Sequence, residues 1–134
     1  MLFVAISGVL ARFLSTENAE RDDVVALLQA QAAGNAEGML DRLTGCGRSP
    51  ACVARTRANA ISLRRRGAVK ILTLKSATAY SLTGASGKTR VAWTVLGRLP
   101  VVQCVQVQRR GNFVTGISVA LVSIGAPISN EGDC

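Results

Sequence analysis

The chain has 134 residues and is 49% hydrophobic, a composition that suits one globular domain and excludes a disordered chain. It carries 16 Lys and Arg against 8 Asp and Glu and has no His, so its formal net charge is +8. Fourteen of the cationic residues lie from Arg42 to Asn130, a stretch that contains no Asp or Glu. General acid–base catalysis near neutral pH usually needs a His or a carboxylate with a shifted pKa. We therefore expect a non-enzymatic protein without a cofactor or a metal ion.

An apolar run, Leu2–Leu10, precedes a polar joint that begins at Ser15. The run resembles the apolar region of a secretory signal, and Val9-Leu10-Ala11 fits a small-residue cleavage pattern. It is too short to span a bilayer, which needs roughly 20 residues. We interpret residues 1–17 as the remnant of a signal or a membrane anchor, with a plain amphipathic helix as the alternative. Residues 18–134 are expected to form a single α+β domain with a C-terminal tail.

Three helices are predicted before any strand. The first covers Glu20–Ala33, because its apolar residues recur at helical spacing and carboxylates occupy its first turn. Asn35 is expected to cap a second, short helix that continues to Leu43. Ser49-Pro50 opens a third helix that runs to about Arg65, because Ser is a favoured N-cap and Pro a favoured first residue.

The pattern changes from helical to alternating after Ala68 and predicts a sheet of about four antiparallel strands. Turns are expected at Thr83–Gly87, Gly97–Pro100 and Gly111-Asn112. Gly116 is expected to mark a bulge or a bend. Five stretches are strand-like: Val69–Leu74, Ala77–Leu82, Arg90–Leu96, Val101–Arg109 and Phe113–Ile124. The second, Ala77–Leu82, either continues the first strand or pairs with it as a hairpin.

The four cysteines are Cys46, Cys52, Cys104 and Cys134. Their spacing does not fit a zinc site, and no His could complete one. Three pairings into two disulfides are possible, and we favour Cys46 with Cys52, which leaves Cys104 with Cys134. Four free thiols in a cytosolic protein are the alternative. Because disulfides persist in oxidising compartments, the cysteines and the apolar run together favour an extracytoplasmic protein, secreted or membrane-tethered.

Helices followed by strands indicate an α+β fold in which N-terminal helices pack on a curved antiparallel sheet. The segment Val25–Leu43, a helix that ends in Gly34-Asn35 and is followed by a short helix, resembles the opening of the NTF2-like (cystatin-like) superfamily. It is similar to small secreted or membrane-tethered bacterial members. By element order the resemblance covers roughly residues 20–125, and it implies a cone that encloses a pocket. Enzymatic members similar to ketosteroid isomerase place carboxylates and a Tyr there. Because the strands here lack Asp and Glu and Tyr80 stands alone, the resemblance transfers no catalytic residue.

Two groups of residues are candidate sites. Cations on and after the third helix form a candidate patch for phosphates or anionic lipid, although Arg64-Arg65-Arg66 also suit the dipole at a helix C-terminus. Tyr80, Trp93 and Phe113 either line the implied pocket or pack in the core. The candidate anion-binding residues are Arg55, Arg57, Arg64, Arg65 and Lys70.

We expect a binding or protein-interaction domain that contacts anionic lipid or a cell-envelope polymer through its basic face. The alternative is a small-molecule carrier or an enzyme that uses the apolar NTF2-like pocket, which a convergent set of polar groups would favour. The sheet is a candidate surface for a homodimer. Nucleic acid is not expected as a partner, because few aromatic residues are interleaved with the basic ones for stacking.

Overall fold

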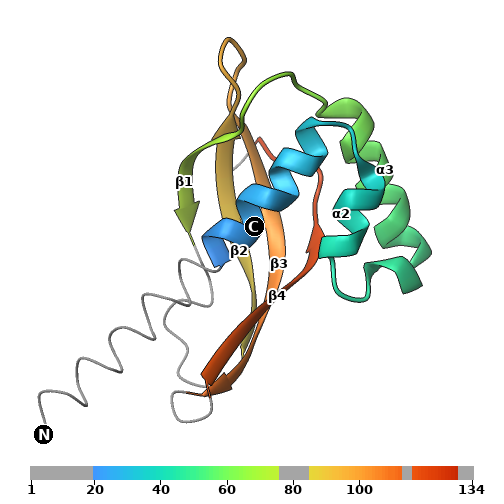
Figure 1. The fold of residues 1–134 in the computed structure, drawn as a ribbon, viewed down its shortest axis with the longest axis vertical. Helices are drawn as coiled ribbons and strands as arrows, with labels where there is room; N and C mark the ends of the chain where they lie inside the picture. Colours follow the sequence, from blue (N-terminus) through green and yellow to red (C-terminus); the bar gives the residue numbers. More distant parts are fainter. Residues whose placement is uncertain (1–19, 76–84, 113–115, 130–134) are drawn as a thin grey trace, which may run out of the picture.

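Helices precede strands in the computed structural model, which describes residues 20–75, 85–112 and 116–129. The first helix, described over residues 20–32, crosses one face of a four-stranded antiparallel sheet (Figure 1). The next two helices lie on the β4 side of that sheet (Figure 1). The expected α+β class is thereby confirmed. The elements after the first helix are α2 (Ala36–Arg42), a 3₁₀ helix (Cys46–Arg48), α3 (Pro50–Ser62), β1 (Lys70–Lys75), β2 (Ala85–Thr94), β3 (Val101–Asn112) and β4 (Gly116–Ile124).

Neighbouring strands of the sheet pair in chain order, β1-β2-β3-β4. Two bulges interrupt the alternation of side chains. Leu72 is the extra residue of β1 opposite β2, and Val122 is the extra residue of β4 opposite β3. Because a bulge adds one residue to one strand, Leu121 and Ile124 are both buried although they are three positions apart. Val122 is two residues from the end of β4, so this bulge lies near the C-terminal end of the strand.

β2 begins earlier and β3 ends later than their local sequence predicts. Gly111 and Asn112, predicted as a hairpin turn, pair instead with Ile117 and Gly116 in the β3–β4 ladder. Gly116 pairs with Asn112 without a register shift, so of the expected bulge or bend the β3–β4 ladder shows no bulge at this residue. Ala85–Gly87, predicted as part of a turn, begins β2. These predictions were wrong because hydrogen bonds from a neighbouring strand outweigh the weak local preferences of Gly, Ser and Asn.

The caps of α2 and α3 follow the local sequence as predicted. The Asn35 side chain accepts a hydrogen bond from the Gly38 backbone N–H at 3.0 Å. The Ser49 hydroxyl accepts from the Cys52 N–H at 3.3 Å, and Pro50 occupies the first turn. Each cap satisfies a donor for which a helix has no partner of its own, and each is typically worth about 1 kcal/mol.

α3 ends at Ser62, short of its predicted end near Arg65, because the chain turns back onto the first helix. The Arg65 backbone N–H donates to the carbonyl of the last residue of that helix at 2.8 Å. Gln29 then holds the following residues through both ends of its amide. Its Nε2 donates to the Gly67 carbonyl at 3.2 Å, and its Oε1 accepts from the Val69 N–H at 2.9 Å. The segment between α3 and β1 is therefore fixed against the first helix.

The core lies between the first helix and the inner face of the sheet. The helix contributes completely buried aliphatic side chains, and the central strands contribute valines around one tryptophan. Fully burying a large apolar side chain stabilises a protein by roughly 1.5–3 kcal/mol. The buried apolar residues of these elements are Val24, Leu27, Leu28 and Ala32 on the helix, and Val91, Trp93, Val105, Val107, Leu121 and Ile124 on the sheet.

Replacing Gly67 with alanine is expected to lower the free energy of unfolding by about 2 kcal/mol. Its φ is +111°, which L residues rarely adopt, and an added Cβ would lie 3.0 Å from Cγ1 of Val95. Gly97 is the matched control, because its φ is +82° but nothing lies within 4 Å of an added Cβ. Gly97→Ala should therefore cost about 1 kcal/mol through backbone strain alone. Urea denaturation measures the free energy of unfolding of both variants. Equal losses of stability would show that the close contact between the added Cβ and Val95 contributes nothing.

After β4 the chain continues along the edge of β3. The Gly125 N–H donates to the Cys104 carbonyl at 2.9 Å, and the Ile128 N–H donates to the Val102 carbonyl at 2.8 Å. The predicted segment 1–17, the strand-like stretch 77–82 and the last five residues, 130–134, lie outside the described residues. Of the helices that are described, none has the length and apolar character needed to cross a membrane.

Candidate anion-binding site

Four arginines line one surface depression of about 520 Å³. Three of them, Arg64, Arg65 and Arg66, follow α3, and Arg98 lies in the β2–β3 turn. Because β1 and β2 are antiparallel, the segment before β1 meets the turn after β2 at the same end of the sheet (Figure 1). We call this depression the arginine cleft; its lining residues are Arg64, Arg65, Arg66, Leu96 and Arg98.

The cleft carries positive charge that no described carboxylate neutralises. Arg65 is half-buried, and its Nη1 donates to the Ser62 carbonyl at 3.3 Å and to the Arg64 carbonyl at 2.8 Å, next to the end of α3. Arg64, Arg66 and Arg98 are exposed. Within the described ranges, none of the four guanidinium groups takes part in an ion pair. Four cations that line one depression repel one another. An anion bound there would interact favourably with all four and would reduce this repulsion.

Backbone hydrogen bonds order the β2–β3 turn that carries Arg98. The Arg98 N–H donates to the Val95 carbonyl at 3.0 Å. The Thr94 hydroxyl donates to the Arg98 carbonyl at 2.9 Å, and Gly97 supplies the positive φ of +82° at the turn. Both backbone polar groups of Arg98 are thus satisfied, and its side chain projects from a fixed frame.

The structure divides the predicted anion-binding residues between several surfaces. Arg64 and Arg65 lie in the arginine cleft, whereas Arg55 lines another depression. Lys70 is exposed at the start of β1 but does not line the cleft. Arg98 is the functional candidate that the sequence reasoning missed. The predicted antiparallel order of the strands could have indicated Arg98. In a sheet with that order, the residues before β1 lie beside the β2–β3 turn.

Arg57 is the fifth predicted residue, and it is engaged elsewhere. Its Nη2 donates to Oε1 of Glu37 on α2 at 3.2 Å, and both side chains are more than half exposed. Exposed ion pairs contribute only about 0–1 kcal/mol, so the pair has little weight for stability. It nevertheless places a carboxylate beside Arg57, which makes this position a poorer site for an anion than the arginine cleft.

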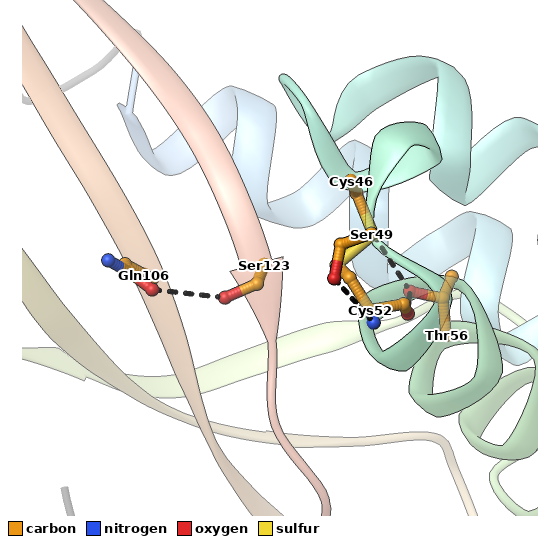
Figure 2. Close-up of a disulfide and its surroundings, with 6 residues drawn as sticks. All are labelled: Cys46, Ser49, Cys52, Thr56, Gln106 and Ser123. Carbon is orange, nitrogen blue, oxygen red and sulfur yellow. Dashed lines mark hydrogen bonds between the residues drawn. A yellow bond between two sulfur atoms is a disulfide. The ribbon is translucent and has the colours of Figure 1, made fainter.

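The predicted disulfide between Cys46 and Cys52 is confirmed, with an S–S distance of 2.03 Å. It joins the 3₁₀ helix to the first turn of α3, beside the Thr56 hydroxyl, which donates to the Cys52 carbonyl at 2.8 Å (Figure 2). Cys104 is also disulfide-bonded, and its expected partner, Cys134, lies outside the described residues. None of the described cysteines is free, so none of them is available as a nucleophile.

A second depression, of about 370 Å³, lies between the start of α3 and the sheet. Its cations are Arg55 and Lys88. Beside them the Ser123 hydroxyl donates to Oε1 of Gln106 at 3.3 Å (Figure 2). With two cations instead of four, this depression is the weaker candidate for an anion. Its other lining residues are Ala51, Cys52, Cys104, Ile124 and Gly125.

A third depression, of about 640 Å³, lies between the first helix and α2 and has mixed charge. Asp41 and Arg42 are both on its wall. Arg42 also acts on Asp23: burial raises the pKa of Asp23 above its usual value, Arg42 lowers it, and Asp22 raises it. Carboxylates beside the single arginine make this depression unsuited to an anionic ligand.

Buried side chains of the described residues lie between the first helix and the sheet. Trp93 is 1% exposed, and its Nε1 donates to Oε1 of Gln103 at 2.8 Å. Gln31 and Gln103 exchange two amide hydrogen bonds, of 2.8 and 3.0 Å. Of the two alternatives for Trp93, pocket lining or core packing, its burial supports the core, and it lines none of the three depressions. The other predicted pocket residues, Tyr80 and Phe113, lie outside the described residues.

One carboxylate reaches the sheet from the helical part of the chain. Glu20 of the first helix is 1% exposed and accepts a hydrogen bond from the Thr89 hydroxyl of β2 at 2.6 Å. The strand sequences contain no acidic residue, so they did not indicate a carboxylate at the sheet. The contact between Glu20 and Thr89 forms only when the first helix packs on the sheet. Glu20 lines none of the three depressions, so these give a substrate no access to it.

The described residues contain no group of three or more His, Cys, Asp or Glu that could hold a metal ion. Of the three depressions, the arginine cleft gathers the most cations. Comparison with known proteins found no matching family model, no matching curated protein and no matching solved structure.

Proposed function

We propose that the protein is a non-enzymatic, extracytoplasmic binding domain that contacts anionic components of the cell envelope through the arginine cleft. The observation that carries this proposal is the convergence of four guanidinium groups, from two separate segments, on one depression without a carboxylate partner among the described residues. Guanidinium groups present several N–H donors in a plane and match phosphate oxygens in pairs.

Phosphate is the anion that this arrangement suits best. Arg64, Arg66 and Arg98 are exposed and remain able to turn toward a ligand, whereas Arg65 is held by backbone carbonyls and supplies charge from a fixed position. Phosphate groups are common to anionic lipids and to many envelope polymers. The cleft is therefore a candidate site for either source.

Disulfide bonding supports the proposed location. Cys46 is 2% exposed and bonded to Cys52, and Cys104 is disulfide-bonded as well. Such bonds are rare in reducing compartments and typical of secreted or envelope proteins. Fractionating the producing cells under thiol-blocking conditions tests this part of the proposal, and reduced protein in the cytosolic fraction would contradict it.

We also propose an NTF2-like origin for the fold. Its support is the order of elements, a helix that ends at Gly34-Asn35, a short helix, and then an antiparallel sheet. Trp93 and Gln103 are buried and hydrogen-bonded to each other, which favours binding at the surface over the pocket of a carrier or an enzyme. A solved structure tests this origin: a sheet that does not curve around the helices would contradict it.

The triple variant R64Q/R66Q/R98Q is expected to weaken binding to phosphatidylglycerol vesicles and to soluble polyphosphate by about 100-fold. The reason is that each Arg near an anionic surface contributes about 1 kcal/mol, and every 1.4 kcal/mol is tenfold. Vesicle sedimentation and titration calorimetry at low salt measure the two affinities.

R21Q/R48Q/K75Q is the matched control, because it removes the same net charge from exposed positions that line none of the three depressions. Its affinity for either anion should fall by no more than about fivefold, because these charges act on the ligand only at long range, where salt screens them. Equal losses in the two triple variants would show that total charge, and not the cleft, is responsible, and would contradict the proposal.

A further inference from the structure

We propose that the β2–β3 turn is a membrane-docking tip, in which Leu96 and Leu99 enter an anionic bilayer while the arginine cleft binds lipid phosphates. This inference rests on the proposed function and adds the partner and the mode of contact. Leu96 is 99% exposed and Leu99 is 87% exposed, on either side of Arg98. The juxtaposition of two almost fully exposed leucines with four arginines is the observation that carries it.

The two leucines are exposed by the geometry of the turn. The turn joins the ends of β2 and β3 and projects beyond the sheet at the upper end of Figure 1, which is also the end where the chain passes from α3 to β1. Gly97 and the hydrogen bonds of Arg98 to Val95 and Thr94 fix the backbone between them. A tip whose central residue has its backbone groups paired enters the polar–apolar boundary at lower cost than an open loop.

The combination of charge and apolar surface selects a bilayer over a soluble polymer. A soluble polyanion would use the arginines but would leave Leu96 and Leu99 in water. An anionic membrane satisfies both, because cations lie at the phosphate level while apolar side chains reach the acyl boundary. From Arg42 to Asn130 the sequence contains no Asp or Glu, so this part of the chain adds no negative side chain that would oppose the approach.

The test uses the full chain, vesicles of phosphatidylcholine with and without phosphatidylglycerol, and polyphosphate as a soluble anion. L96S/L99S is expected to bind anionic vesicles at least 30-fold more weakly. The single variant L99S leaves the lining of the arginine cleft intact and is expected to bind polyphosphate with unchanged affinity. L72S is the matched control, because Leu72 is 45% exposed on β1, away from the cleft. It should change vesicle affinity by less than about threefold.

A second variant reports insertion directly. Leu99→Trp places an indole at the tip, and its emission should shift to the blue and be quenched by brominated lipid when anionic vesicles are added. Trp93 is 1% exposed, so its own emission should stay unchanged. Vesicles of phosphatidylcholine alone should give little shift, because the arginines then lack anionic partners.

The outcomes separate this inference from the proposed function. Unchanged vesicle affinity in L96S/L99S, together with no blue shift in Leu99→Trp, overturns the docking tip and leaves an arginine-only surface. Tight binding to polyphosphate without binding to anionic vesicles also overturns it and identifies a soluble polymer as the partner. If R64Q/R66Q/R98Q binds both anions like the parent chain, the proposed function itself fails.

Discussion

Replacing Gln103 with leucine is expected to lower the free energy of unfolding by about 3 kcal/mol. Gln103 is fully buried and joins three elements: its Oε1 accepts from Trp93 at 2.8 Å and from Gln31 at 2.8 Å. Its Nε2 donates to Gln31 at 3.0 Å and to the Gly125 carbonyl at 3.0 Å. Leucine would leave the indole N–H and the Gln31 amide without these partners. Each buried group that loses its partner costs about 1–3 kcal/mol, partly offset by the apolar side chain.

Gln31→Leu is the matched comparison and should cost only about 1 kcal/mol. Without Gln31, the Gln103 oxygen still accepts from Trp93 and its nitrogen still donates to Gly125. The double variant Q31L/Q103L should lose less than the sum of the single losses, because the unpaired amide of Gln31 is removed as well. Chemical denaturation of all three variants measures the cycle. Equal losses for the two single variants would contradict the asymmetric role assigned to Gln103.

Removing the disulfide with C46A/C52A is expected to lower the free energy of unfolding by about 2 kcal/mol and Tm by roughly 5–10 °C. The bond closes a short loop, with a sequence separation of 6, so the entropy that it removes from the unfolded chain is at the low end for disulfides. Buried Cys46 also loses its contact with the Thr56 hydroxyl, at 3.6 Å. Differential scanning calorimetry under non-reducing conditions measures the shift.

Ser49→Ala is the control for local damage at the start of α3. It removes the cap to the Cys52 N–H but leaves the sulfur bridge, and it should cost about 1 kcal/mol. If C46A/C52A lowered the free energy of unfolding no more than Ser49→Ala does, the disulfide would stabilise the protein no more than the helix cap alone. A loss of binding to anionic vesicles in C46A/C52A at 20 °C is not expected, because the arginine cleft lies at the other end of α3.

Local rules predicted the elements whose determinants lie within a few residues of one another. Asn35 and Ser49 cap the helices where expected, because a cap bonds an N–H only three residues away. The bond between Cys46 and Cys52 followed from their closeness in the chain. Val105 and Val107 belong to the predicted strand-like stretch Val101–Arg109, and both are buried in the core.

The residues of the predicted basic patch lie on separate surfaces, because their positions depend on contacts between distant parts of the chain. The patch joined Arg55 and Arg57 to Arg64 on the assumption that one helix carried all three. α3 ends at Ser62 because the next segment bonds to the first helix, so Arg64 lies beyond the helix and lines one depression with Arg98. A contact between two segments that are distant in the chain depends on strand order and packing, which local propensity does not contain.

By itself the amino-acid sequence determined the α+β class, the helix caps, the Cys46–Cys52 bridge and a chain rich in positive charge, since these follow from nearby residues and from composition. Only the tertiary structure decided where β3 continues through Gly111 and Asn112, where Val122 bulges and which arginines share a cleft. The physical reason is that strand pairing and helix docking supply hydrogen bonds and buried surface from remote parts of the chain, and these outweigh the weak preferences of each local stretch.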